Sequence, residues 1–145
     1  MQRDRLERAA DILEAQATVL SFMEHFDYGN AEAAAGLFTE DGVWHRGDGL
    51  VRGKGMLVDL INRRDRNLVV RHLISNIRSE WLNEDRILIH AYVTLLSQRS
   101  ETTPQQFPLP FDGVAGFGRY EDELHRSDGR WLIARKKTVT ELKKK

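Results

Sequence analysis

The sequence contains no cysteine, which excludes disulfides, thiolate nucleophiles and cysteine-ligated zinc or iron–sulfur sites. No apolar run approaches the roughly 18 residues of a membrane span. The N-terminal segment Met1–Arg5 leads into a charged amphipathic stretch rather than the apolar core of a signal peptide. We therefore expect a cytoplasmic protein with no membrane partner.

An excess of one charge is also missing, because Lys+Arg and Asp+Glu number 22 each. A balanced chain has no general attraction for nucleic acid, so we expect no such partner. The run Arg63-Arg64-Asp65-Arg66 mixes both signs and is predicted to be a solvated helix end. The five histidines are scattered, without ligand spacing in a regular element, so we predict no metal and no cofactor. At this length we predict a single domain, residues 1–145.

Apolar residues three and four positions apart predict a long amphipathic helix from Asp4 to about Asp27. Gly29 suits the position just after that helix, and Asn30 suits the N-cap of a short helix over 31–38. A third helix is predicted over 56–64.

Alternating apolar residues and turn signals predict the strands. The expected strands are 43–46, 69–81, 86–98, 117–126 and 131–139, with a hairpin or loop at 47–53. Asp128-Gly129 between the last two is the strongest hairpin signal in the chain. Helices first and strands later predict an α+β fold, with helices on one face of a curved antiparallel sheet. All three prolines fall in 99–115, a long loop that is either a lid over a cavity or an arm packing on another subunit.

One predicted strand carries polar residues on an apolar face. Strand alternation places Val70, His72, Ile74 and Asn76 on the same side. An imidazole and an amide there are either a satisfied core pair or the floor of a pocket. Which of the two holds decides whether the chain is an enzyme.

Six motifs in a fixed order cover nearly the whole chain. They are Phe26–Asn30, Leu37–Trp44, Gly53–Gly55, Arg71–Asn76, Gly118–Leu124 and Asp128–Arg135. Taken together they resemble the SnoaL-like branch of the nuclear transport factor 2-like proteins. That branch also holds scytalone dehydratase and the small subunits of ring-hydroxylating dioxygenases. The resemblance implies a cone-shaped α+β barrel, in which the sheet curls around the first helix and leaves an apolar cavity.

The same resemblance implies two catalytic positions. Dehydratases of this family place an acid at the end of the first helix and a histidine on the first long strand, which Asp27 and His72 match. Phe26 stands where the fungal dehydratase has a tyrosine, and the second histidine of that enzyme has no counterpart, because His90 comes several residues too early. A carboxylate fixes the tautomer of an imidazole, so this pair is suited to moving protons. The alternative is a structural hydrogen bond joining helix to sheet.

Five further residues are candidate substrate contacts, each with a plainer alternative. They are Tyr28, Trp44, Asn76, His90 and Tyr92. The alternatives are a helix-end cap for Tyr28, a core position for Trp44 and a strand bulge for Asn76. His90 and Tyr92 share a strand face that either lines the cavity or forms an oligomer interface.

The leading hypothesis is a lyase (dehydratase) or isomerase that acts by proton transfer on a small, cyclic, apolar, oxygenated compound. The alternative is a non-catalytic subunit or ligand-binding module, like the dioxygenase small subunits. A homodimer or homotrimer is expected in either case, because a sheet covered on one side only must be shielded, and 86–98 offers alternating apolar residues for that contact.

Overall fold

A computed structural model describes residues 4–145 of the chain. Residues 1–3, the start of the charged segment Met1–Arg5, lie outside the described residues. The helices are α1 (Arg5–Tyr28), α2 (Ala31–Ala35) and α3 (Gly53–Arg63). The strands are β1 (Phe38–Arg46), β2 (Gly49–Arg52), β3 (Leu68–Asn83), β4 (Arg86–Arg99), β5 (Gly116–Ser127) and β6 (Arg130–Lys143). In the part described, no helix is both long and apolar enough to cross a membrane.

Both ends of α1 follow the local sequence. Asp4 accepts a hydrogen bond from the backbone N of Glu7 at 2.8 Å, and the Glu7 carboxylate accepts one from the backbone N of Asp4 at 3.2 Å, which forms a capping box. At the other end Gly29 has φ +75°, and the Asn30 backbone N donates to the His25 carbonyl at 2.8 Å. The predicted role of Gly29 as the helix terminator is confirmed.

Replacing Gly29 by alanine is expected to lower the free energy of unfolding by about 1–2 kcal/mol. The left-handed backbone at this position disfavours any Cβ, and an added Cβ would lie 3.1 Å from Nη1 of Arg66. Urea unfolding monitored by circular dichroism measures the loss. Gly36→Ala is the matched control, since Gly36 has φ −62° and its nearest neighbours to an added Cβ are at 3.5 Å. An equal loss in both variants would contradict the explanation.

The six strands form one sheet in the order β2-β1-β6-β5-β4-β3. All pairs are antiparallel except β1 with β6, which run parallel, so the expected all-antiparallel sheet is in fact mixed. After β1 the chain passes through β2 and α3 to the far edge, and the meander from β3 to β6 returns beside β1. The β5–β6 hairpin turns at Asp128-Gly129 with φ values of +50° and +76°, as its sequence predicts.

The second helix is shorter than predicted and the first strand is longer. The helix ends at Ala35, and β1 begins at Phe38 instead of Val43. Phe38 explains the difference, because its buried ring stacks on Phe22 with centroids 5.1 Å apart. Packing into the core outweighs the helical preference of the alanine-rich segment.

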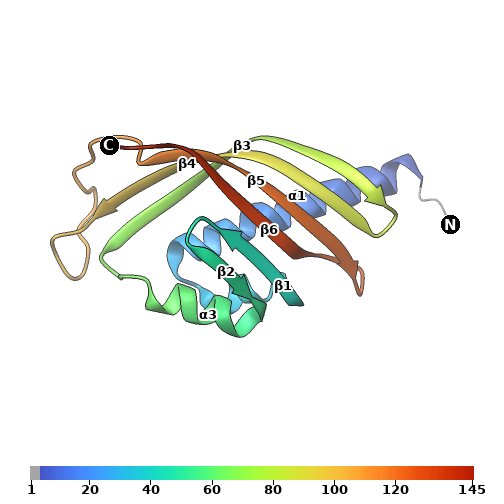
Figure 1. Cartoon of the computed structure of the whole chain (residues 1–145), viewed down its shortest axis with the longest axis horizontal. Coiled ribbons are helices and arrows are strands. Elements are labelled where there is room, and N and C mark those ends of the chain that lie inside the picture. Colours follow the sequence, from blue (N-terminus) through green and yellow to red (C-terminus); the bar gives the residue numbers. More distant parts are fainter. Residues whose placement is uncertain (1–3) are drawn as a thin grey trace.

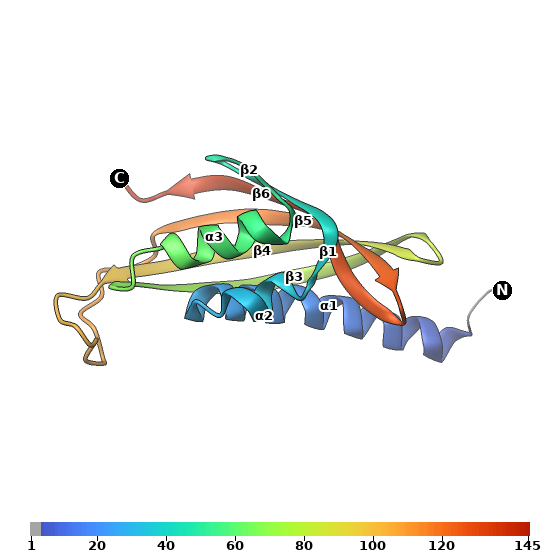
Figure 2. The same ribbon diagram turned by 90° about the horizontal axis from the view of Figure 1, so that it is seen from below.

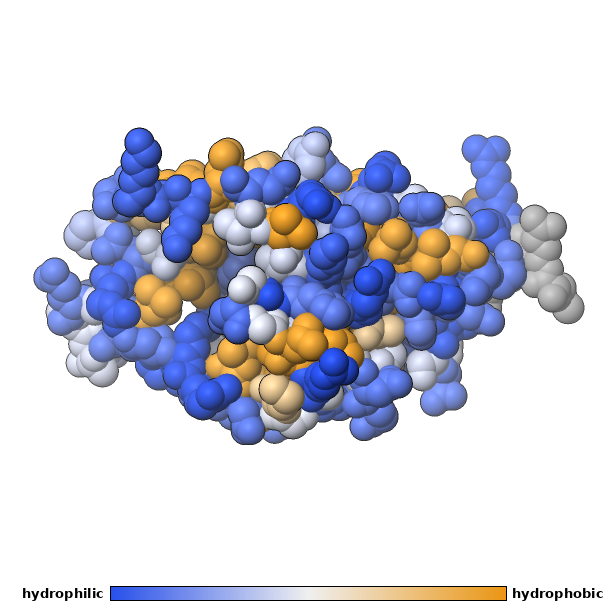
Figure 3. Space-filling view, viewed as in Figure 1, coloured by the Kyte–Doolittle hydropathy of each residue, from blue (hydrophilic) through white to orange (hydrophobic). Residues whose placement is uncertain are grey.

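The sheet is strongly curved and open, and the helices lie on its concave side, which makes the cone-shaped α+β fold expected from the sequence (Figures 1 and 2). Helix α1 contacts β3, β4 and β6, whereas α3 contacts β1 and β2. The core between these layers contains Phe22, Phe38, Trp44, Ile133 and Leu124 among its buried residues. The surface in Figure 3 is largely hydrophilic, with a hollow at the left beside the segment that joins α3 to β3.

Candidate functional site

Asp27, in the last turn of α1, forms two hydrogen bonds to His72 on β3. Its Oδ2 accepts from the His72 backbone N at 2.8 Å, and its Oδ1 lies 2.5 Å from Nδ1 of the imidazole. Strand β3 is the last strand of the sheet, so the His72 N–H points to a free edge where the carboxylate can reach it. The contact expected between these two side chains, 45 residues apart, is therefore present.

The carboxylate determines which imidazole nitrogen carries the hydrogen. An ionised carboxylate only accepts hydrogen bonds, so Nδ1 of His72 is the donor and Nε2 carries the lone pair. No residue within 4–145 bonds to Nε2. The edge of the Phe26 ring packs on the imidazole with centroids 5.7 Å apart. His72 is thus held in one orientation with its basic nitrogen available.

His72 lines a small cavity on the concave side of the sheet, here called the inner cavity. Its volume is about 80 Å³, and its wall includes His72, Val93, Leu95, Phe117, Tyr120, Thr138 and Thr140. The Thr138 hydroxyl accepts a hydrogen bond from Nε1 of Trp44 at 2.9 Å. An apolar cavity of about 150 Å³ holds benzene, so the inner cavity in this state admits only part of a ring.

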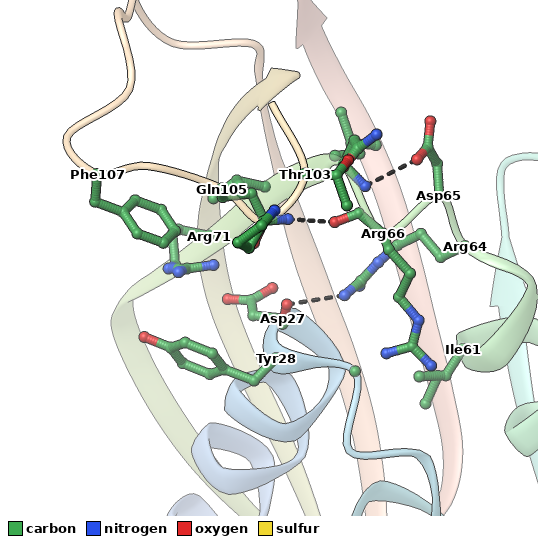
Figure 4. A pocket seen from close by; sticks show the side chains of 15 residues that line it. Asp27, Tyr28, Ile61, Arg64, Asp65, Arg66, Arg71, Thr103, Gln105 and Phe107 are labelled. Carbon is green, nitrogen blue, oxygen red and sulfur yellow. Dashed lines mark hydrogen bonds between the residues drawn. The ribbon is translucent and has the colours of Figure 1, made fainter. Parts of the chain in front are cut away.

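Asp27 lines a different and larger space at the end of α1, here called the mouth pocket. Its volume is about 370 Å³, within the range of small-ligand sites. It is bounded by the end of α1, the segment 64–71 and the loop residues Thr103, Gln105 and Phe107 (Figure 4). The Asp27–His72 pair therefore lies between two cavities, with the carboxylate on one side and the imidazole on the other.

Comparison with known proteins identifies the fold family. Residues 7–137 match the family described as the SnoaL-like domain. The chain belongs to this family. No curated protein matches it by sequence.

Solved structures that resemble this SnoaL-like domain share its fold at low sequence identity. A hexachlorocyclohexane dehydrochlorinase, LinA-type3, from Novosphingobium barchaimii has a TM-score of 0.80 and 20% identity, covering 97% of this chain and 93% of that one. A proposed scytalone dehydratase from Novosphingobium aromaticivorans has a TM-score of 0.77 and 20% identity, covering 94% of this chain and 88% of that one. A protein of unknown function from Mycobacterium tuberculosis has a TM-score of 0.78 and 24% identity, covering 93% of this chain and 74% of that one.

Of the five predicted substrate contacts in this SnoaL-like domain, only Tyr28 lies in a cavity beside the pair. It lines the mouth pocket, and the guanidinium carbon of Arg71 lies 4.3 Å from its ring centroid. Trp44 is a core residue, packed edge-on against Phe22 and Phe26 with centroids 5.5 and 5.4 Å apart. It reaches the inner cavity only through its bond to Thr138.

Asn76, His90 and Tyr92 lie together in a hollow on the convex face of the sheet, away from His72. Asn76 has φ +50° in a bulge between Ser75 and Arg78, so the expectation that it shares the face of His72 is wrong. The bulge shifts the alternation by one residue, and Ile77 takes the core-facing position instead. On β4 the core-facing residues are Ile87, Ile89, Ala91 and Val93. His90 and Tyr92 therefore point outward.

Three arginines around the mouth pocket were not among the predicted site residues. Arg64 donates to the carbonyls of Phe26 and Asp27 at 2.6 and 2.8 Å and so caps the end of α1. Burial lowers the pKa of its guanidinium, Asp27 opposes that shift, and Arg66 and Arg71 lower the pKa further. The sequence predicts a solvated helix end for Arg63-Arg64-Asp65-Arg66, and the fold shows that part of this run borders a pocket.

A buried ion pair lies behind the wall of the inner cavity. Nζ of Lys136 donates to Oδ2 of Asp122 at 2.7 Å, and neither side chain is exposed. Nζ also lies 3.7 Å from the ring centroid of Tyr120. Burial lowers the pKa of Lys136 and raises the pKa of Asp122, while each partner opposes the shift of the other. The pair places a cation directly under one aromatic wall residue of the cavity.

Among residues 4–145, no three His, Asp or Glu side chains are grouped so that they could hold a metal ion. Proton transfer is the chemistry that the Asp27–His72 geometry itself suits, since it requires a fixed imidazole tautomer with one accessible nitrogen.

Proposed function

We propose that this SnoaL-like domain is a lyase that eliminates water from a small, apolar, oxygenated compound by acid/base proton transfer. The observation that carries the proposal is the pair of hydrogen bonds that the Asp27 carboxylate accepts from the backbone N and from Nδ1 of His72. It orients the imidazole so that Nε2, which lacks a partner among residues 4–145, serves the inner cavity.

The proposed reaction begins with a compound that carries a hydroxyl group two carbons from a carbonyl carbon. Nε2 of His72 takes a proton from the carbon between them, and the electrons of that C–H bond form a C=C bond. The hydroxyl leaves as its C–O bond breaks and takes up the proton that Nε2 of His72 received, so that the products are water and the conjugated carbonyl compound and His72 returns to its neutral form. Asp27 stabilises the imidazolium that forms in between, because it lies 2.5 Å from Nδ1. If the proton returns to a different carbon instead, the same site acts as an isomerase.

Two structural neighbours support an elimination. One is named as a proposed scytalone dehydratase and another as a hexachlorocyclohexane dehydrochlorinase, and these names describe the loss of water and of hydrogen chloride. Both eliminations need a base for a C–H proton, which is the role proposed for His72. Hydroxide is therefore the leaving group proposed for this chain, and chloride is the alternative leaving group.

The size of the inner cavity bears on the substrate. With about 80 Å³ available, the reacting carbons fit, but a complete ring requires a wall residue such as half-buried Leu95 to move aside. Open-chain and cyclic β-hydroxy ketones therefore both belong in a substrate panel, with the open-chain compounds favoured if the wall is rigid.

The test is the formation of conjugated ketone, followed by its ultraviolet absorbance, from such a panel. His72→Gln is expected to lower kcat by about 10²–10⁴ for any compound that wild type converts, since removal of a general base costs that much. His90→Gln is the matched control, because His90 lies on the opposite face of the sheet, 3.3 Å from Glu80. Equal turnover by wild type and His72→Gln would refute the proposal.

A non-catalytic subunit or ligand-binding module is the second candidate, and the convex face of the sheet favours it. Leu73, Tyr92 and Leu142 on β3, β4 and β6 are 49%, 45% and 66% exposed, which is unusual for large apolar side chains. A homodimer or homotrimer, or a larger partner, would cover them. If wild type converts no compound of the panel, this candidate replaces the lyase.

A further inference from the structure

The mouth pocket gathers more positive than negative charge. Arg64, Arg66 and Arg71 line it, and the acidic residues along its wall are Asp27 and Asp65. Asp65 is already paired with Arg99, outside the pocket. Asp27 uses both oxygens on His72. The mouth pocket therefore holds two positive charges in excess. Their mutual repulsion costs energy unless an anion enters the pocket.

The guanidinium groups of Arg64 and Arg66 approach the same point of the pocket wall, and the guanidinium of Arg71 lies on the other side of Asp27, over the Tyr28 ring. One point, where a Cβ on Gly29 would lie, is 3.1 Å from Nη1 of Arg66 and 3.9 Å from Nη2 of Arg64. In Figure 4, Arg64 and Arg71 flank Asp27, and Arg66 extends along the wall toward Ile61. Within 4–145, neither Arg66 nor Arg71 has a carboxylate partner, so both are available to a ligand.

An apolar hollow adjoins the mouth pocket through a common wall. Val69, Arg71 and Phe107 line both spaces. The second space has a volume of about 510 Å³ and is formed by the convex side of β3 and β4 and by the loop residues Pro108, Leu109 and Phe111. We call it the loop hollow. Phe107 is 63% exposed at the boundary, although aromatic side chains of its size are normally covered.

The loop that forms this wall is tied to the segment that carries the arginines. The Gln105 side chain donates to the Arg66 carbonyl, and the Thr103 hydroxyl donates to Oδ1 of Asn67 at 3.0 Å. The Ser100 backbone N donates to the Asn67 carbonyl at 2.7 Å. These bonds hold Phe107 next to the cations, so that the polar and apolar parts of the site have a defined spacing.

We propose that the mouth pocket and the loop hollow together bind an organic acid, whose carboxylate contacts Arg66 and Arg71 beside Arg64 and whose apolar part packs on Phe107. Guanidinium groups match the two oxygens of a carboxylate, and a fixed polar head next to an apolar slot is the usual form of a small-molecule site. Because the acid reaches Asp27 from the side opposite to the inner cavity, the site is distinct from the proposed place of proton transfer. Binding requires no turnover and does not depend on the proposed lyase.

The test is titration calorimetry with three probes: 3-phenylpropionate, its neutral analogue 3-phenylpropanamide, and acetate. The phenylpropionate is expected to bind at least tenfold more tightly than the amide, and more weakly as salt is added. Arg66→Gln is expected to weaken its binding by about tenfold to a hundredfold, the effect of one charged hydrogen bond. Arg63→Gln is the matched control, because Arg63 is exposed on α3 and donates only to the Asp59 carbonyl.

Phe107→Ala separates the two halves of the site. It is expected to weaken the binding of phenylpropionate but to leave the binding of acetate unchanged, because acetate has no group that reaches the loop hollow. Equal affinity for the acid and the amide, or an equal loss in Arg63→Gln and Arg66→Gln, would overturn the proposal. Failure of wild type to bind phenylpropionate would overturn it as well, whether or not the β-hydroxy ketones are converted.

Discussion

Replacing Lys136 by methionine is expected to lower the free energy of unfolding by about 3–5 kcal/mol, because it leaves Asp122 buried without its cation. Asp122 has no exposed surface, its Oδ2 is 2.7 Å from Nζ of Lys136, and its Oδ1 has no partner within 4–145. Methionine fills nearly the same volume, so the loss reports the uncompensated charge and not a cavity. Urea unfolding at pH 7 measures it.

A double-mutant cycle separates the interaction between Lys136 and Asp122 from the effect of removing either side chain alone. Lys136→Met combined with Asp122→Leu removes both charges, and well-packed apolar replacements of a buried pair are often neutral or stabilising. The double variant is therefore expected to recover most of the stability lost in Lys136→Met. If both variants are equally unstable, packing around Tyr120 is the cause and the electrostatic explanation is wrong.

The deficit of Lys136→Met also depends on pH. Burial raises the pKa of Asp122 above its ordinary value of 3.8, and removing Lys136 removes the cation that opposes that shift. A carboxyl group whose pKa is raised by folding lowers stability by its full amount above that raised pKa, and this cost declines to zero as the pH falls from the raised pKa to the pKa of the unfolded state. The difference in the free energy of unfolding between Lys136→Met and wild type should therefore become smaller as the pH falls from 7 to 4.

Replacing Asp27 by asparagine is expected to lower kcat by about 10²–10⁴ on any compound that wild type converts. The amide of asparagine has one acceptor oxygen, whereas the carboxylate accepts from the backbone N and from Nδ1 of His72 at once. One of those two donors must lose its partner, which frees the imidazole tautomer and costs about 1–3 kcal/mol of stability. Turnover is measured well below the melting temperature, and circular dichroism gives the folded fraction.

Asp65→Asn is the control for this prediction. Asp65 lines the same mouth pocket, but its carboxylate pairs with Arg99 and, within residues 4–145, forms no hydrogen bond to His72, so its loss should leave kcat unchanged. Full activity in Asp27→Asn would mean that the pair is only a structural link between α1 and β3. An equal loss of activity in Asp65→Asn would assign the effect to the charge of the pocket and not to the orientation of the imidazole.

The resemblance to the SnoaL-like family implies the contact between Asp27 and His72, and the periodicity of the sequence places one of them at a helix end marked by Gly29 and the other on a strand. The sequence does not predict the position of Asn76, since a single bulged residue reverses the faces of everything after it. The sequence does not predict the buried Lys136–Asp122 pair either. In sequence the two residues stand in charged hairpin strands, and only the paired register of β5 and β6 turns both inward.

The arginines of the mouth pocket are a further feature that the local sequence does not predict. Arg64 and Arg66 look like an ordinary solvated helix end, because nothing local indicates that a loop some 40 residues later closes over them. Long-range contacts of this kind depend on the path of the chain around the sheet and not on any local propensity.

The bond between Asp27 and the backbone of His72 has a consequence for solubility. An outermost strand offers its unpaired N–H and C=O groups to any other extended chain, and this is a common origin of aggregation. At His72 that donor is already satisfied by a carboxylate that also brings negative charge to the edge. This hydrogen bond lies four residues before the bulge at Asn76, so the two features interrupt the edge of β3 at neighbouring points. The side chain that orients the imidazole therefore also removes one backbone donor from the edge at which another extended chain could pair.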